Sequence, residues 1–150
     1  MAVDLQTENV ARLIQLALGP VFLLNGVGIT LGMLTNRLSR IVDRARSLEV
    51  QRENSADEKK VAHIDWDLHV IARRARYING AIALSTTSAF LTTLVVMFLF
   101  GSEFVSAPLG GYIAGMFVAA MIVLSIAFLL FLFEVRLATQ SLRIGGKLKH

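Results

Sequence analysis

A charge-free apolar stretch that runs directly into an arginine-rich segment constrains this chain more than any other feature. Residues 13–36 carry no charged side chain, and residues 37–46 hold four arginines and neither proline nor glycine. A helix needs about 20 apolar residues to cross a hydrocarbon core roughly 30 Å thick. Because nothing in residues 37–46 breaks a helix, we expect one long helix that crosses a membrane and continues into water.

Two further stretches, residues 77–102 and 104–133, are also free of charge. They lack the polar–apolar alternation of barrel strands, and only helices or closed barrels satisfy the backbone in lipid. We therefore predict an all-α integral membrane protein, a single membrane domain over residues 1–150. The expected transmembrane spans cover about residues 12–36, 78–100 and 109–133, followed by a tail at 134–150.

The basic residues predict the orientation of these spans. Ten lysines and arginines lie between the first two spans and four in the tail, whereas the loop between the second and third spans has none. Cytoplasmic segments are enriched in lysine and arginine, so we expect the bacterial inner membrane, with the N-terminus outside and the C-terminus in the cytoplasm. This topology accounts for the net charge of +4, and no nucleic-acid-binding surface is expected.

Two apolar rows with the same 4-3-4-3 spacing border the first two spans. The first is Leu34, Leu38, Ile41, Ala45 and Leu48, and the second is Ile64, Leu68, Ile71, Ala75 and Ile78. Such rows are typical of coiled-coil seams. They predict a cytoplasmic antiparallel helical hairpin at about residues 37–77 that extends the first two transmembrane helices. Residues 51–60 have no apolar period and are expected to connect its two helices.

The first predicted helix carries a polar, small-residue face opposite its apolar row. At about 100° per residue, this face contains Asn25, Gly28, Gly32, Asn36, Ser39 and Asp43. Asparagine is costly in lipid, so the face should meet protein or water. Three interpretations remain open: packing within the chain, packing between copies in a homo-oligomer, and a pore lined by this helix.

Charged residues at the inner membrane surface form a second candidate network. Arg37, Arg40 and Arg44 flank the apolar row, and Glu134 follows the third span at the same expected depth. A carboxylate there needs a partner, so we expect Glu134 to pair with Arg37 or Arg40. The remaining arginines are expected to contact the phosphates of anionic lipids at the cytoplasmic face.

No metal, cofactor or enzymatic activity is expected. His63/Asp67 and Asp65/His69 are spaced as metal-binding pairs, but the two pairs point about 160° apart on a helix, so one chain cannot gather all four ligands. The sequence contains no nucleophile–base pair and no phosphate-binding loop.

Two motifs carry a family resemblance. Pro20 followed by Leu23 and Leu24, and the run from Asn36 to Arg46, resemble a bacterial family of small three-span membrane proteins catalogued only as a domain of unknown function. The resemblance implies an inner-membrane protein and brings no activity.

Two functions therefore remain as hypotheses. The first is a homo-oligomeric ion channel lined by the polar face of the first helix. The second is a non-conducting scaffold or adaptor whose cytoplasmic hairpin binds a protein partner or anionic lipid.

Overall fold

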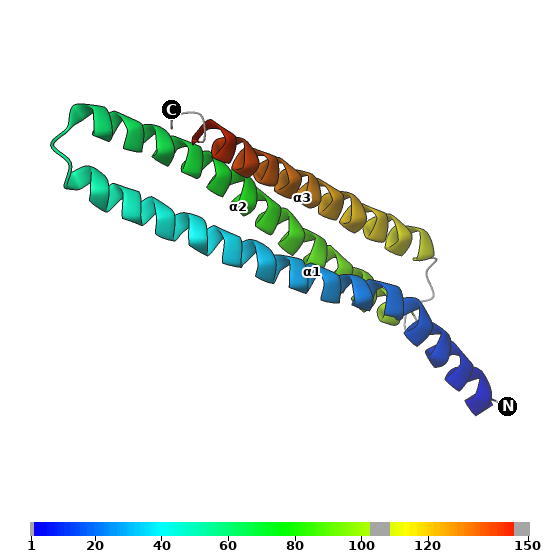
Figure 1. Cartoon of the computed structure of the whole chain (residues 1–150). Coiled ribbons are helices and arrows are strands. Elements are labelled where there is room, and N and C mark those ends of the chain that lie inside the picture. Colours follow the sequence, from blue (N-terminus) through cyan, green and yellow to red (C-terminus); the bar gives the residue numbers. More distant parts are fainter. Residues whose placement is uncertain (1, 103–108, 146–150) are drawn as a thin grey trace. The chain divides into compact units, whose positions relative to one another are not determined.

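All the helices and strands assigned among the residues that the structure, a computed structural model, describes are helices. The described residues are 2–102 and 109–145, with side chains described for residues 10–102 and 109–138. The helices are α1 (Ala2–Glu53), α2 (Glu58–Gly101) and α3 (Gly110–Gly145) (Figure 1). The predicted loop between the second and third spans falls mainly on residues 103–108, outside the described residues.

Each helix contains a stretch long and apolar enough to cross a membrane: Val10–Glu53, Glu58–Gly101 and Gly110–Ala138. Many large apolar side chains on these stretches are exposed in the single chain, among them Phe22 and Ile29. Exposed apolar surface of this extent is unusual for a protein surrounded by water, whereas lipid would cover it without cost.

Helix α1 passes the junction between the apolar stretch and the arginine-rich segment without a break, which confirms the predicted continuity. It also continues through Pro20. The predicted connection at residues 51–60 is shorter than expected, because the helices occupy all of it except residues 54–57. The backbone N–H of Lys59 donates to Oδ1 of Asp57 at 3.0 Å, so Asp57 caps the N-terminus of α2 and allows the helix to begin early.

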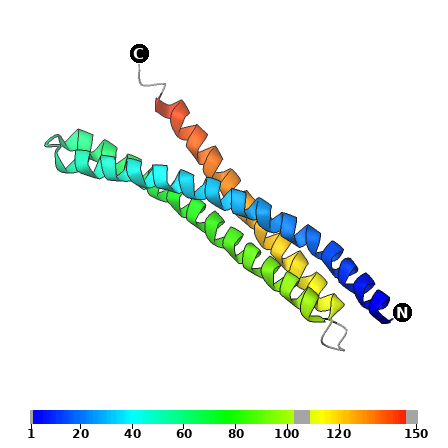
Figure 2. The ribbon, with the colours of Figure 1, turned by 90° about the horizontal axis from the view of Figure 1, so that it is seen from below.

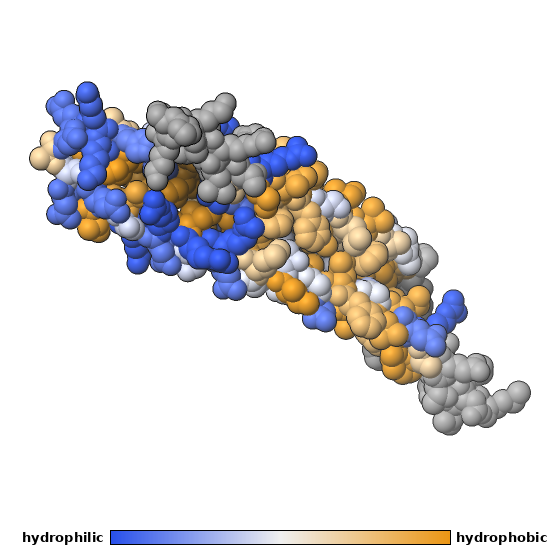
Figure 3. All heavy atoms as spheres, in the orientation of Figure 1, coloured by the Kyte–Doolittle hydropathy of each residue, from blue (hydrophilic) through white to orange (hydrophobic). Residues whose placement is uncertain are grey.

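The chain divides into two compact units that each draw on all three helices. Unit 1 comprises Met1–Leu31 and Leu84–Ser125, and unit 2 comprises Gly32–Ala83 and Ile126–His150. On the face seen in Figure 3, hydrophobic atoms cover most of unit 1, and hydrophilic atoms gather on the part of unit 2 near the connection between α1 and α2.

The interior of unit 1 contains hydroxyl groups. Ser85, Ser88 and Thr92 of α2 are fully buried. The hydroxyl of Ser88 donates to the carbonyl oxygen of Ala120 on α3 at 2.8 Å, and that of Thr92 donates to the carbonyl oxygen of Ser88 at 2.8 Å. The first bond joins two helices, as serine commonly does in apolar surroundings, and the second satisfies the hydroxyl within its own helix.

Unit 2 has an aliphatic core between α1 and α2. Its buried members are Leu34, Ile41, Ile78 and Ala81, and Leu38, Ile71 and Ala75 pack against them. All ten residues of the two apolar rows are buried or half-buried. The two helices lie side by side in both views of this unit (Figures 1 and 2).

Helix α3 approaches this core closely at one glycine. A Cβ atom at Gly80 would lie 3.1 Å from Cδ1 of Leu130, so the missing side chain lets α3 pack tightly on α2. Farther toward its C-terminus, α3 diverges from the α1–α2 pair of unit 2 (Figure 2).

Candidate functional site

One buried carboxylate joins the three helices of unit 2. Glu134 of α3 is 0% exposed. Its Oε2 accepts a hydrogen bond from the Arg37 guanidinium of α1 at 2.8 Å, and its Oε1 accepts two from Arg74 of α2, at 2.9 and 3.3 Å. A buried carboxylate is costly unless it is paired and hydrogen-bonded, and here both oxygens are satisfied by opposite charges.

The network has a net charge of +1, because two guanidinium groups share one carboxylate. Part of the excess is met by an aromatic ring, because the guanidinium carbon of Arg37 lies 5.1 Å from the ring centroid of Phe131. The electron-rich face of a ring attracts a cation at this distance. Arg37 is thereby fixed by two contacts with α3. The hydrogen bond to Glu134 uses one of the five N–H donors of its guanidinium.

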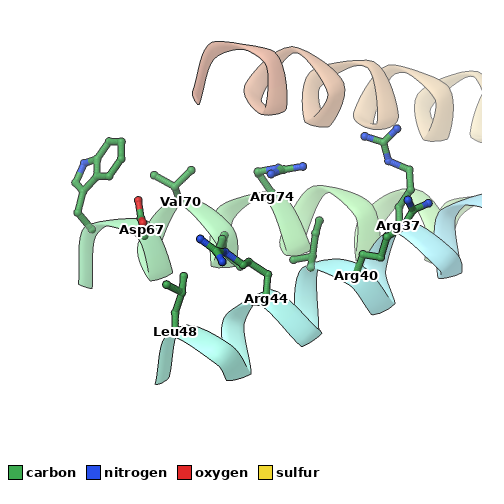
Figure 4. Close-up of a pocket in the computed structure, with 10 residues that line it drawn as sticks. Arg37, Arg40, Arg44, Leu48, Asp67, Val70 and Arg74 are labelled. Atoms are coloured by element: carbon green, nitrogen blue, oxygen red, sulfur yellow. The ribbon is translucent and has the colours of Figure 1, made fainter. Parts of the chain in front are cut away.

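A cavity of about 650 Å³ lies between α1 and α2 beside this network. Four arginines line it: Arg37, Arg40 and Arg44 from α1, and Arg74 from α2 (Figure 4). The other lining residues are mostly apolar, and they are Ile41, Leu48, Trp66, Val70 and Ile71, with the carboxylate of Asp67. The cavity therefore combines positive charge with an apolar wall.

The polar face of α1 takes no part in the Glu134 network or in the lining of the cavity. In unit 1, Asn25 and Gly28 are exposed, and in unit 2 the same holds for Gly32, Asn36, Ser39 and Asp43. A Cβ placed on Gly28 or Gly32 would meet no atom of another described helix within 4 Å. The side of α1 that packs within the chain carries Val27, Leu34 and Ile41 instead. Packing within the chain, one of the three interpretations of this face, is therefore not found among the described residues.

Comparison with known proteins identifies the family. The family described as "Protein of unknown function (DUF2721)" matches residues 17–144. The chain belongs to the DUF2721 family. The matched residues of this DUF2721 protein include the Glu134 network, the arginine-lined cavity and the whole polar face of α1. No curated protein and no solved structure matches the chain.

The structure brings some of the predicted charged residues together and separates others. Arg37 and Glu134 form an ion pair, whereas Arg40 and Arg44 line the cavity and form no ion pair with the described residues. Within the candidate metal-binding pairs, Asp65 instead forms an exposed ion pair with Arg52 at 2.6 Å. Among the described residues, no three metal-ligating side chains lie close together.

Two residues of the site in this DUF2721 chain were not predicted from its sequence. Arg74 was counted only among the charges that set orientation, and Trp66 had no predicted role. Arg74 directly precedes Ala75 of the second apolar row. Charged residues that flank a seam lie beside the packed interface, so this position could have marked Arg74 as a candidate, although not its partner on α3.

Proposed function

We propose that this protein is a homo-oligomer of the bacterial inner membrane, in which copies meet around the polar face of α1 and enclose a small ion-conducting pore. Three helices long and apolar enough to cross a membrane support the membrane assignment. The concentration of lysine and arginine between the first two helices supports an orientation with the N-terminus outside and the C-terminus in the cytoplasm.

The exposure of the polar face in the single chain carries this proposal. An amide side chain such as that of Asn25 has no hydrogen-bond partner in hydrocarbon, and leaving it there is costly. Gly28 and Gly32 are open and would let two helix backbones approach closely. Copies of α1 arranged around an axis would remove the face from lipid and supply the missing hydrogen bonds, either between copies or to water.

The spacing of the polar residues fits a pore. Asn25 and Asn36 are eleven residues apart on the same face, which corresponds to about 16 Å along a helix with a rise of 1.5 Å per residue. In an oligomer the two asparagines would form two rings of amides. Gly28 and Gly32, which have no side chains, would lie between the rings. Polar rings of this kind line the pores of many channels.

We also propose that the parts of α1 and α2 in unit 2 form a cytoplasmic antiparallel helical hairpin. The shared core of Leu34 and Ile41 with Ile78 supports it, as does the ion pair between Arg52 and Asp65 near the connection. The hairpin extends both helices beyond the membrane and is a surface for cytoplasmic partners.

Orientation can be tested with single cysteines, since the chain has no natural one. We expect Ser55→Cys, in the connection between α1 and α2, to be protected from an impermeant thiol reagent on intact cells. Ser102→Cys, after α2, is expected to be labelled. Breaking the membrane should make both positions reactive. Labelling of Ser55→Cys with protection of Ser102→Cys in intact cells would contradict the proposed orientation.

Conduction can be tested by ion flux into liposomes that contain the wild-type protein or Asn25→Leu. If Asn25 lines a water-filled path, a ring of leucines should dewet it and reduce flux to the level of empty liposomes while the oligomer persists. Gly28→Leu is expected to shift the protein toward monomers, because it blocks close approach of the helices.

The alternative function is a non-conducting scaffold or adaptor, whose hairpin binds a protein partner or anionic lipid. An assembled wild-type oligomer without flux in several salts would exclude the pore and favour this scaffold. Equal flux from wild type and Asn25→Leu would exclude the polar face as the conducting path.

A further inference from the structure

We infer that the arginine-lined cavity of unit 2 binds a phosphate group carried on an apolar body, such as the headgroup of an anionic phospholipid. The cavity is independent of the pore, because it lies on the side of α1 that faces α2.

The charge of the cavity calls for an anion. Arg40 and Arg44 line it without an ion pair among the described residues. They stand four positions apart on one helix, where like charges repel each other. Even with Asp67 and Glu134 counted against the four arginines, two positive charges remain. Bound phosphate would relieve this repulsion.

Two of the four arginines are already held in place. Glu134 fixes Arg37 and Arg74 from the side of α3, and their side chains remain 30% and 22% exposed. Each guanidinium has five N–H donors, and the structure uses only one from Arg37 and two from Arg74 for Glu134. Pre-positioned guanidinium groups lose little freedom on binding and suit the oxygens of phosphate.

The rest of the cavity suits an apolar body. Leu48 and Val70 lie toward the end of the helix pair away from Arg37 (Figure 4), and Ile41 and Ile71 line it as well. Its volume of about 650 Å³ lies within the range of small-molecule sites, about 300–1,000 Å³. A phosphate ester with its phosphate among the arginines and an apolar body beside Leu48 and Val70 would place charge and apolar surface in matching regions.

Such a phosphate can come from a lipid or from solution. The lipid source rests on the membrane insertion proposed above, which puts Arg37 and Arg40 at the depth of lipid phosphates. The phosphate chemistry of the cavity does not depend on it, and a pore that fails to conduct leaves this inference untouched.

Trp66 gives the test a local reporter, because it lines the cavity and is the one tryptophan in the chain. The full-length protein in neutral detergent would be titrated with short-chain phosphatidylglycerol, short-chain phosphatidylcholine and inorganic phosphate, while Trp66 emission is recorded. Native mass spectrometry would count bound lipid in parallel. We expect saturable binding of phosphatidylglycerol, and much weaker binding of phosphatidylcholine, whose headgroup has no net charge.

Two double variants that remove the same charge separate the cavity from general attraction. Arg40→Gln/Arg44→Gln should weaken phosphatidylglycerol binding at least about tenfold, since two charge-assisted contacts are lost. Arg46→Gln/Arg73→Gln is the control, because both arginines are exposed and lie outside the cavity. It should leave the affinity within about twofold. Neither pair makes an ion pair with the described residues, so both variants should fold, which circular dichroism would verify.

The binding measurements distinguish a lipid ligand from a soluble phosphate and from no phosphate ligand. Binding of phosphatidylglycerol but not inorganic phosphate, lost only in the Arg40/Arg44 variant, supports a lipid ligand. Saturable binding of inorganic phosphate with the same arginine dependence supports a soluble phosphate. If neither Trp66 emission nor the count of bound lipid responds to either anion, or if both double variants lose binding equally, the inference is wrong.

Discussion

Replacing Glu134 with glutamine is expected to destabilise the protein by about 3 kcal/mol, because it leaves Arg37 and Arg74 without their counter-charge beside the core. The value lies at the lower end for a broken buried ion pair, since both arginine side chains are partly exposed. In thermal unfolding followed by circular dichroism in detergent, this loss corresponds to a fall of about 10 °C in Tm. Glutamine has nearly the same shape as glutamate, so the effect reports charge rather than packing.

The matched control for this variant is Asp65→Asn. The ion pair of Asp65 with Arg52, at 2.6 Å, is shorter than those of Glu134, at 2.8 and 2.9 Å. The side chains of Arg52 and Asp65, however, are 52% and 47% exposed. Exposed ion pairs contribute at most about 1 kcal/mol, so Tm should change by no more than about 3 °C. Equal losses in Glu134→Gln and Asp65→Asn would show that burial of Glu134 has no energetic consequence.

Replacing Ile41 with aspartate is expected to cost about 4 kcal/mol or more, because it removes an aliphatic side chain from the core and puts an unpaired charge there. Ile41 is 8% exposed, whereas the neighbouring Val42 is 39% exposed. Val42→Asp introduces the same charge one residue away, and we expect a change within about 1 kcal/mol. The free energy of unfolding of the two variants, measured in the same detergent, compares the two faces of α1 at equal depth.

Ile71→Asp extends this test to the partner helix, since Ile71 packs against the same core. Residues that share a core are not independent, so the double variant should cost less than the sum of the two single variants. If Ile41→Asp and Val42→Asp unfold alike, the apolar row of α1 is not buried in the protein.

The sequence determined the helices and the faces that they present. Long charge-free stretches and a repeated 4-3-4-3 spacing are local properties of the chain, and they predict helices and buried rows before any contact is known. All ten residues of the two rows are buried or half-buried in the structure. The early start of α2 was missed, although Asp57 is a residue type that caps helices.

The partners of the charged residues were decided only by the tertiary structure. Arg37 and Arg40 are equivalent in sequence as candidates for Glu134, since both follow the first apolar stretch. The rotation of α1 against α3 brings Arg37 to the carboxylate and directs Arg40 to the cavity. Arg74 joins them from a position 60 residues before Glu134, a separation at which local pattern carries no information about contact.

For the polar face of α1, too, the sequence determined one property and the tertiary structure another. Helical periodicity alone places Asn25, Gly28, Gly32 and Asn36 on one side of the helix. Whether the rest of the chain covers that side depends on how α2 and α3 pack, and they leave it exposed among the described residues. A helix of this kind has two faces able to pack, and only the fold selects which one is used within the chain and which one stays open for another molecule.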